Sequence, residues 1–287
     1  MKIALARCST QFEAQADDAQ YVRALVERGA EVHCPAWTDP TVDWSSFDVV
    51  QLRSTWDYHE RPDAFAEWVR HVDAVSQLFN RRNVVEWNLD KRYLRALSAA
   101  GVPVVPTHWV EADVELQDAA LAEVVASLGG RAMWKPAIGA DSFGAVPVSP
   151  DTVSQVARDA PRGVVYMLQP YLTSVETEGE VSVIVFDGTP SHAVRKRPQV
   201  GDFRVQDNHG GTDAPEPLTP ELEALAARTL AAVPGSTPLV ARVDLMFDDA
   251  GRYLLGELEL IEPSLFFVHS PRAAQRLADA LWARVAG

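Results

Sequence analysis

Apolar and polar positions in the first 85 residues alternate between two periods, one typical of strands and one typical of helices. Lys2–Arg7 is a nearly continuous apolar run, and Asp17–Arg28 has apolar residues at helical spacing before Gly29. Further strands are predicted at Glu31–Cys34 and Phe47–Arg53. Helices and strands that alternate in this way favour a parallel sheet with right-handed crossovers. We therefore expect an open α/β unit here.

The middle of the chain follows a different pattern. Either Asn88 or Asp90 can cap a helix that runs through Ala100 and stops at Gly101, and a short strand is expected directly after it. A second helix is predicted over Leu116–Leu128, and a strand over Arg131–Lys135. This segment predicts a second, smaller α/β unit.

The last third predicts antiparallel strands and two helices. Val164–Leu172 is an apolar strand, and Gly179–Phe186 and Pro190–Arg197 are strands joined by an Asp-Gly turn. Thr219 caps a predicted helix that ends at Ala232, and the closing helix is predicted over Pro271–Val285. Between these helices lies a further hairpin that carries carboxylates.

In this hairpin, alternation puts Glu257 and Glu259 on one face of their strand. If Asp244 pairs opposite residue 257 or 255, all three carboxylates share that face. They would then repel one another unless a cation lies among them, and hard oxygen ligands suit Mg²⁺ or Mn²⁺. The alternative is an edge hairpin whose charges face water, which is the default for a Glu-x-Glu strand.

Composition narrows the class of protein. The 287 residues are 47% hydrophobic and carry a formal net charge of -14, which argues against a nucleic-acid or anionic membrane surface. The expected partner is a small molecule, and a homodimer is left open. The two cysteines, Cys8 and Cys34, predict neither a disulfide framework nor a metal cluster. No signal peptide or membrane span is expected, so the sequence indicates a cytoplasmic protein.

Three polar segments are candidates for binding. Lys135 precedes the small-residue loop Gly139–Gly144, whose backbone could approach phosphate oxygens, although this is not a P-loop. Arg53–Tyr58 follows a predicted strand, where Arg53 could clamp a substrate carboxylate or the segment could simply turn into a helix. The glycine-bounded loop 201–211 with its preceding basic residues is either an anion site or a solvated loop.

Read in order, these segments resemble the ATP-grasp superfamily, most closely the RimK-type and glutathione-synthetase-like ligases. The resemblance covers roughly Trp87 to the end, and it implies an α/β fold in which an N-terminal parallel sheet joins two lobes that clasp ATP. It implies three domains, 1–86 on the substrate side, 87–168 as the central lobe and 169–287 as the lobe with the metal site. ATP and Mg²⁺ or Mn²⁺ are the implied cofactors.

The resemblance also implies roles for individual residues. Lys91 and Lys135 would contact the nucleotide phosphates, and Arg204 would face the transferred phosphate, so that Lys135 and Arg204 are the implied catalytic residues. The implied contacts to adenine and ribose are Gln169, Tyr171 and Leu172, followed by Glu180 or Glu176, and the implied metal ligands are Asp244, Glu257 and Glu259.

Two departures from the family pattern concern the acceptor. Glu259 replaces the usual Asn, and Glu262 is inserted in the turn after the metal strand, where it could bind an ammonium group. The expected substrate residues are Arg53, Ser54, Asp57, Glu262 and Ser264. The strings E-L-E-L-I-E-P-S-L and R-S-T-W-D-Y resemble ATP-grasp enzymes that form D-cycloserine from O-ureido-D-serine.

The resemblance therefore implies an ATP-dependent ligase that activates a small amino-acid-like molecule and condenses or cyclises it. Two alternatives remain open from the sequence. One is a phosphotransferase on the same scaffold, which would release a stable phosphorylated product. The other is a non-catalytic ATP sensor, which the intact carboxylates disfavour.

Overall fold

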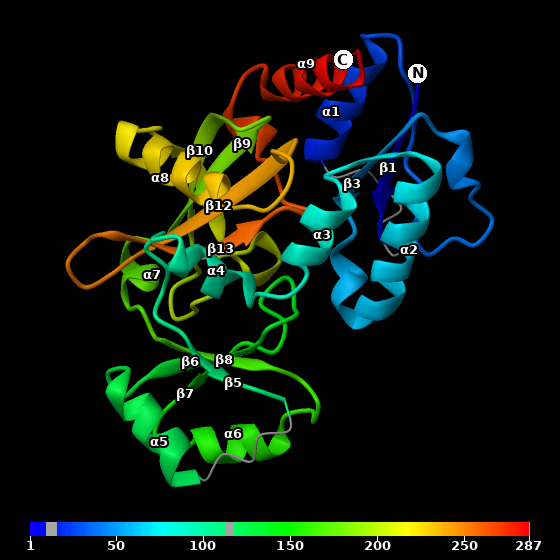
Figure 1. Cartoon of the computed structure of the whole chain (residues 1–287). Coiled ribbons are helices and arrows are strands. Elements are labelled where there is room, and N and C mark those ends of the chain that lie inside the picture. The colour runs from blue at the N-terminus through cyan, green and yellow to red at the C-terminus, as the bar shows by residue number, and fades with distance from the viewer. Residues whose placement is uncertain (10–15, 113–117, 287) are drawn as a thin grey trace.

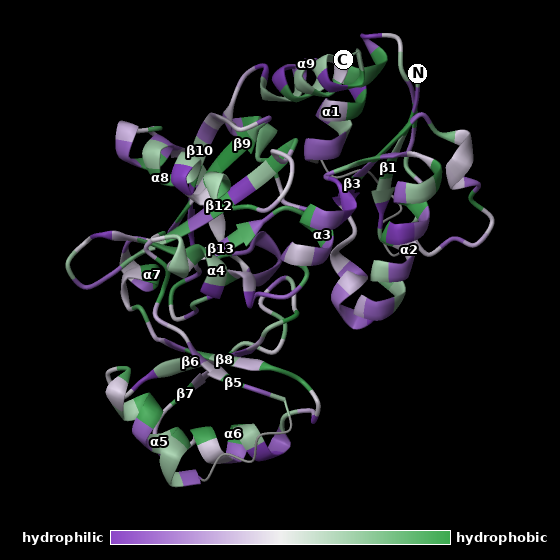
Figure 2. Cartoon of the chain, in the orientation of Figure 1, coloured by the Kyte–Doolittle hydropathy of each residue, from purple (hydrophilic) through white to green (hydrophobic). Residues whose placement is uncertain are grey.

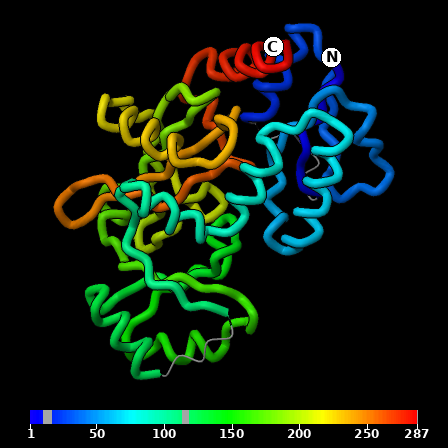
Figure 3. Tube along the Cα trace, viewed as in Figure 1, coloured from blue at the N-terminus to red at the C-terminus, as the bar shows by residue number. Residues whose placement is uncertain are grey.

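The computed structural model describes residues 1–9, 16–112 and 118–286, and these residues form three sheets that lie in three lobes (Figure 1). The N-terminal and C-terminal lobes lie side by side, and the central lobe projects from them at one end. The two termini lie near each other, as the Cα trace shows (Figure 3). No helix among the described residues is long and apolar enough to cross a membrane.

The N-terminal sheet has the order β2-β1-β3-β4, and every neighbouring pair of strands is parallel, as predicted. Its strands are nearly free of exposed apolar residues because helices cover the sheet. The elements of this lobe are β1 (Lys2–Arg7), α1 (Ala16–Val26), β2 (Glu31–His33), the 3-10 helices Trp44–Ser46 and Trp56–Glu60, β3 (Val49–Ser54), α2 (Pro62–Val75), β4 (Gln77–Phe79) and α3 (Arg82–Asn88).

The central sheet is antiparallel with the order β5-β8-β6-β7. Helices α5 and α6 cover one of its faces (Figure 1), and Trp134 stacks on Tyr166 with 4.7 Å between ring centroids. Its elements are β5 (His108–Val110), α5 (Asp118–Ser127), β6 (Ala132–Pro136), β7 (Val146–Val148), α6 (Val153–Asp159) and β8 (Tyr166–Pro170).

The largest sheet is antiparallel and has the order β11-β10-β9-β12-β13. Thr219 caps α8 as predicted, because its hydroxyl accepts a hydrogen bond from the Leu222 amide. The elements are α4 (Tyr93–Ala99), α7 (Ser174–Thr177), β9 (Glu180–Phe186), β10 (Thr189–Arg197), the 3-10 helix Asp207–His209, β11 (Thr212–Glu216), α8 (Pro220–Ala231), β12 (Val240–Phe247), β13 (Tyr253–Glu259), the 3-10 helix Phe267–His269 and α9 (Ala273–Ala286).

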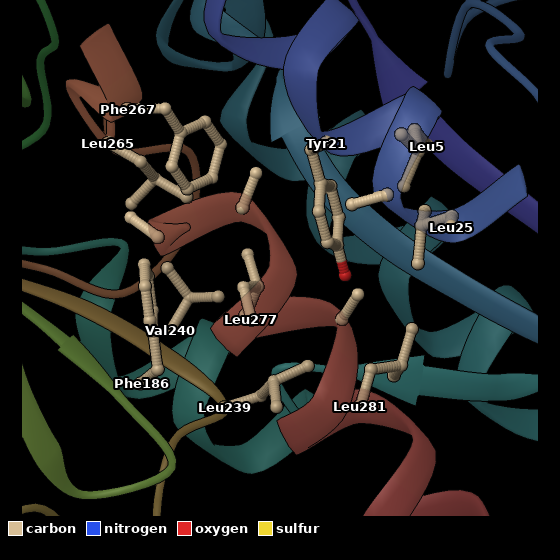
Figure 4. Close-up of a cluster of buried hydrophobic side chains, with 14 of the residues drawn as sticks. Leu5, Tyr21, Leu25, Phe186, Leu239, Val240, Leu265, Phe267, Leu277 and Leu281 are labelled. Carbon is tan, nitrogen blue, oxygen red and sulfur yellow. The ribbon is translucent and has the colours of Figure 1, made fainter. Parts of the chain in front are cut away.

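A shared core joins the first and last lobes. Hydrophobic and hydrophilic residues alternate along α9 (Figure 2), and its apolar face packs against α1 and the large sheet. Figure 4 shows Tyr21 of α1 and Leu277 of α9 in this core, beside Phe186 of β9. Because both chain ends contribute to one core, these two lobes are held in a defined relative position.

Some local predictions were wrong. Of the two possible caps, Asn88 instead ends α3, whereas the Asp90 side chain accepts a hydrogen bond from the Arg92 amide just before α4. The predicted helix up to Ala100 begins only at Tyr93. The strand expected directly after Gly101 is reduced to a single bridge between Val104 and Leu255. Strand β11 and helix α6 carried no clear signal in the sequence. The predicted start of the helix at Leu116 lies outside the described residues.

Candidate active site

A cavity of about 580 Å³ lies where the three lobes meet. Its walls come from the Trp56–Tyr58 turn of the N-terminal lobe, from the Gly139–Gly144 loop of the central lobe and from the face of β12 and β13 that bears the carboxylates. This volume is within the range of cofactor and small-molecule sites. The cavity is therefore large enough for a cofactor or a small-molecule substrate.

The hairpin of β12 and β13 has one of the two expected registers. Asp244 lies opposite Glu257, and Arg242 lies opposite Glu259. Leu258, between Glu257 and Glu259, is 1% exposed and belongs to a hydrophobic core, and all three carboxylates line the cavity. The predicted convergence of the three carboxylates on one face is confirmed.

Arg242 is the cation among these carboxylates, and we did not identify it from the sequence. Its guanidinium donates to Asp244 at 2.9 to 3.1 Å and to Glu259. Alternation could have revealed it, because Arg242 lies two residues before Asp244 and therefore on the same face of β12. The site is consequently less acidic than the three carboxylates alone suggested.

Burial and charge separate the pKa values of the two acids that Arg242 binds. Burial acts to raise the pKa of Asp244, but Arg242, Lys196 and the Ser182 hydroxyl outweigh it and lower this pKa to about 2. Burial raises the pKa of Glu259 to about 7, because the attraction of Arg242 is opposed by the nearby charges of Asp244 and Glu257. Glu259 can therefore hold a proton near neutral pH.

Three of the four lysines lie at the cavity. Lys91 pairs with Glu257 at 2.9 Å and donates to the Gly139 carbonyl. Lys196, which we did not assign to the site, pairs with Glu180 and lies 3.6 Å from Asp244. Lys135 is partly accessible from the cavity, and we find no hydrogen bond or ion pair of its amine within residues 1–9, 16–112 and 118–286. Burial lowers the pKa of Lys135.

Two loops that line the cavity are bonded to each other. The Ser142 hydroxyl donates to Gln206 at 3.2 Å, and Asn208 donates to Asp141 at 2.6 Å, so the loop 139–144 is tied to the loop 201–211. The Phe143 ring also packs against the His59 ring of the N-terminal lobe, with 4.8 Å between the ring centroids. These contacts bring the three lobes together at the mouth of the cavity.

Arg204 and the expected adenine-side residues lie outside this cavity. Arg204 donates to Asp202, while the neighbouring residues Phe203 and Val205 line the wall. Gln169 donates to Thr107 at 2.8 Å, and Tyr171 lies under the Arg131 guanidinium and donates to Glu176. Of the residues expected to contact adenine and ribose, which are Gln169, Tyr171, Leu172, Glu176 and Glu180, only Glu180 lines the cavity.

The expected substrate residues divide into two groups. Arg53 and Ser54 both donate to Asp18, at 2.9 and 2.6 Å, and none of the three lines the cavity. Asp57 accepts from Trp37 at 2.6 Å and is also outside it.

Glu262 and Ser264 do line the cavity, together with Trp56 and Tyr58. Trp56 donates to the Glu262 carbonyl at 3.1 Å. The Glu262 side chain is 5% exposed and has no hydrogen bond or ion pair within the described parts of the chain. Burial, with the nearby Glu259 and Glu257, raises its pKa well above the usual range.

The carboxylates fit a divalent cation by donor chemistry, because Asp244, Glu257 and Glu259 offer hard oxygen ligands. As they stand, however, no three His, Cys, Asp or Glu side chains among the described residues are gathered closely enough to hold a metal. Arg242 and Lys91 occupy these acids instead. A bound metal would have to share or replace these partners.

Solved structures of ATP-grasp ligases have the same fold. The chain matches the structure of the ATP-grasp ligase PsnB with Mg and ADP at a TM-score of 0.68 and 17% identity, over 99% of this chain and 98% of that one. It matches D-alanine–D-alanine ligase from Bacillus anthracis at a TM-score of 0.72 and 17% identity, over 100% and 97% of the two chains. The chain therefore has the ATP-grasp fold, as the resemblance in its sequence implied.

A narrower similarity is also present. The family model described as the N-terminal domain of D-cycloserine synthetase DcsG matches residues 3–80. The cycloserine biosynthesis protein DcsG of Streptomyces lavendulae is 37% identical over 268 residues, which are 87% of each chain. The crystal structure of D-cycloserine synthetase DcsG matches with a TM-score of 0.89 and 29% identity, over 99% of this chain and 100% of that one. The chain therefore belongs to the DcsG family of ATP-dependent ligases.

Proposed function

We propose that the cavity binds MgATP together with a small zwitterionic amino acid derivative and closes it into a ring. The carboxylate of the substrate attacks the γ-phosphorus of ATP, and ADP leaves. A nitrogen of the same molecule then attacks the acyl carbon, so that a C–N bond forms and inorganic phosphate leaves. The similarity to DcsG supports a D-cycloserine-type product.

The observation that carries this proposal is the unpaired Glu262 at the acceptor end of the cavity. It follows the carboxylate strand directly, and it is buried without a partner among the described residues. A buried carboxyl group is costly unless a cation or hydrogen-bond donor satisfies it. A substrate ammonium group would satisfy it, and this interaction would hold the substrate with its own carboxylate toward the nucleotide.

The remaining residues take roles that follow from charge. Lys135, whose amine has no partner among the described residues, and Lys91 would bind phosphate oxygens, because attack by an anion on a triphosphate requires its charge to be neutralised. When bound through Asp244, Glu257 and Glu259, Mg²⁺ or Mn²⁺ would supply the same neutralisation. The loop 139–144 would exclude water from the acyl phosphate.

The test is phosphate release from MgATP, screened over amino acids and their hydroxylamine, ureido and dipeptide derivatives, with mass spectrometry of each product. We expect release with a ureido or hydroxylamine derivative and a product of lower mass than the substrate. Glu257→Gln should fold normally and lose most phosphate release. A stable phosphorylated product would instead identify a phosphotransferase, and ATP binding without release for every compound would identify a sensor.

Glu262→Gln separates the acceptor side from the nucleotide side. The amide keeps the shape of the carboxyl group but cannot pair with an ammonium group as an anion. We expect the substrate KM to rise about tenfold or more, as for loss of a charge-assisted hydrogen bond. The KM for ATP should change by less than about twofold, and an unchanged substrate KM would contradict the assignment of Glu262.

A further inference from the structure

Among the described residues, strand β13 lies at the edge of the large sheet, because it pairs with β12 on one side and has a single bridge, from Leu255 to Val104, on the other. The other edge of β13 would expose unpaired N–H and C=O groups beside the cavity. Such groups are costly when they are buried, and they are normally satisfied by a neighbouring strand or by side chains. In this protein the segment from Asn80 to Val105 satisfies them without forming a strand.

Asn88 makes the most informative of these contacts. Its side-chain amide donates to the Leu258 carbonyl at 2.8 Å and accepts from the Leu260 amide at 2.8 Å. A residue of a parallel strand placed opposite Glu259 would make the same two bonds. The Asn88 side chain thus makes, on either side of Glu259, the two hydrogen bonds that a neighbouring strand would otherwise make.

The backbone around Glu257 is held by a second side chain. The Tyr93 hydroxyl accepts from the Leu258 amide at 3.0 Å, and Tyr93 is 4% exposed. Farther along β13, Leu255 forms backbone hydrogen bonds with Pro103 and Val105. The amide that follows Glu257 is therefore held by Tyr93, and the amide that follows Glu259 is held by Asn88.

We propose that Asn88, assisted by Tyr93, is a positioning residue that holds Glu257 and Glu259 at the spacing the active site requires. Asn88 itself lines the cavity but lies behind the two acids, on their backbone. Side chains that hold metal-binding or catalytic groups from behind commonly change affinity by 10- to 100-fold when they are removed. The inference rests on the proposed function insofar as the two acids act on the magnesium nucleotide.

Asn80 provides a matched control. It is as buried as Asn88, at 5% against 6% exposed, and its amide also bonds to the backbone of β12 and of the residue after β13. It donates to Val240 and Leu260 at 2.8 and 2.7 Å and accepts from Leu239 at 2.7 Å. Asn80 does not line the cavity. It bonds the carbonyl of Leu260, which follows Glu259, but it makes no bond to Leu258, which lies between the two acids and is bonded by Asn88.

The experiment compares ADP binding with and without Mg²⁺ in the full chain, by calorimetry, together with the thermal midpoint of each unliganded variant. We expect Asn80→Ala, which loses four hydrogen bonds, to lower the midpoint at least as much as Asn88→Ala, which loses two. Only Asn88→Ala should weaken MgADP binding, by about tenfold or more. ADP binding in excess chelator should change by less than about twofold in both variants.

Tyr93→Phe tests the same support of the β13 backbone with a smaller change, since it removes only the hydroxyl and keeps the ring. It should weaken MgADP binding about threefold. If Asn88→Ala does not fold, the MgADP affinity of Tyr93→Phe tests the positioning role instead. Unchanged MgADP affinity in the folded variants, or an equal loss in Asn80→Ala, would overturn the inference. A wild-type protein that binds MgADP but forms no product would contradict the proposed ring closure alone.

Discussion

Replacing Arg53 with Met tests whether this arginine binds substrate or stabilises the N-terminal lobe. Arg53 is 3% exposed, and its guanidinium donates to Asp18 at 2.9 Å and to the Pro263 carbonyl at 3.4 Å. Asp18 is 7% exposed, and without Arg53 its side chain keeps the Ser54 hydroxyl as its one hydrogen-bond partner within residues 1–9, 16–112 and 118–286. Removing one partner of a buried ion pair typically costs about 3–5 kcal/mol. We expect a loss of this size in the free energy of unfolding.

Urea unfolding of Arg53→Met, of Asp18→Leu and of the double variant measures the coupling between the two side chains. The double variant should recover a large part of the loss, because two apolar side chains leave no buried charge. Phosphate-release kinetics of the folded protein complete the comparison. Since Arg53 also contacts the residue after Glu262, the substrate KM should change only modestly.

The reasoning would be refuted if Arg53→Met unfolded at the same urea concentration as the wild type while its substrate KM rose strongly. Such a result would mean that Arg53 leaves Asp18 when substrate binds. The arginine would then be the carboxylate clamp that the sequence suggested.

Two further predictions concern single ionisable groups. Lys135→Ala should lower turnover by roughly 10², the scale for a preorganised charge in phosphoryl transfer, whereas Lys2→Arg, outside the cavity, should leave it unchanged in the same assay. An unaffected Lys135→Ala would remove this lysine from the chemistry. Burial lowers the pKa of His192 to about 4, and this ring bonds to the Leu265 carbonyl at 2.8 Å. Because the unfolded state binds the proton more tightly, stability present above pH 6.5 should fall by up to roughly 3 kcal/mol as the pH drops to 4. In the His192→Leu variant, the urea midpoint of unfolding should depend less on pH between 6.5 and 4 than in the wild type. An unchanged pH dependence would contradict the role of His192 in this loss of stability.

Local pattern was sufficient for much of the fold. Hydrophobic periodicity predicted the parallel N-terminal sheet, and residue type predicted the Asp-Gly turn at Asp187 and the cap at Thr219. Each of these features depends on residues close together in the chain. Period-two alternation also predicted that Asp244, Glu257 and Glu259 share one face. The order of these segments was enough to identify the ATP-grasp fold. The three domain boundaries stay predictions, although each of the three sheets lies mainly within one of the predicted ranges.

Tertiary structure alone decided which polar groups are already paired. Arg53 finds Asp18, Arg242 is shared by two carboxylates, and Asn88 serves the backbone of β13 from a distant part of the chain. The sequence identifies side chains that can donate or accept, but pairing depends on distances across lobes that local periodicity does not encode. Glu262 became the strongest acceptor-side candidate for the same physical reason, since a buried carboxyl group without a partner is recognisable only once all its neighbours are in place.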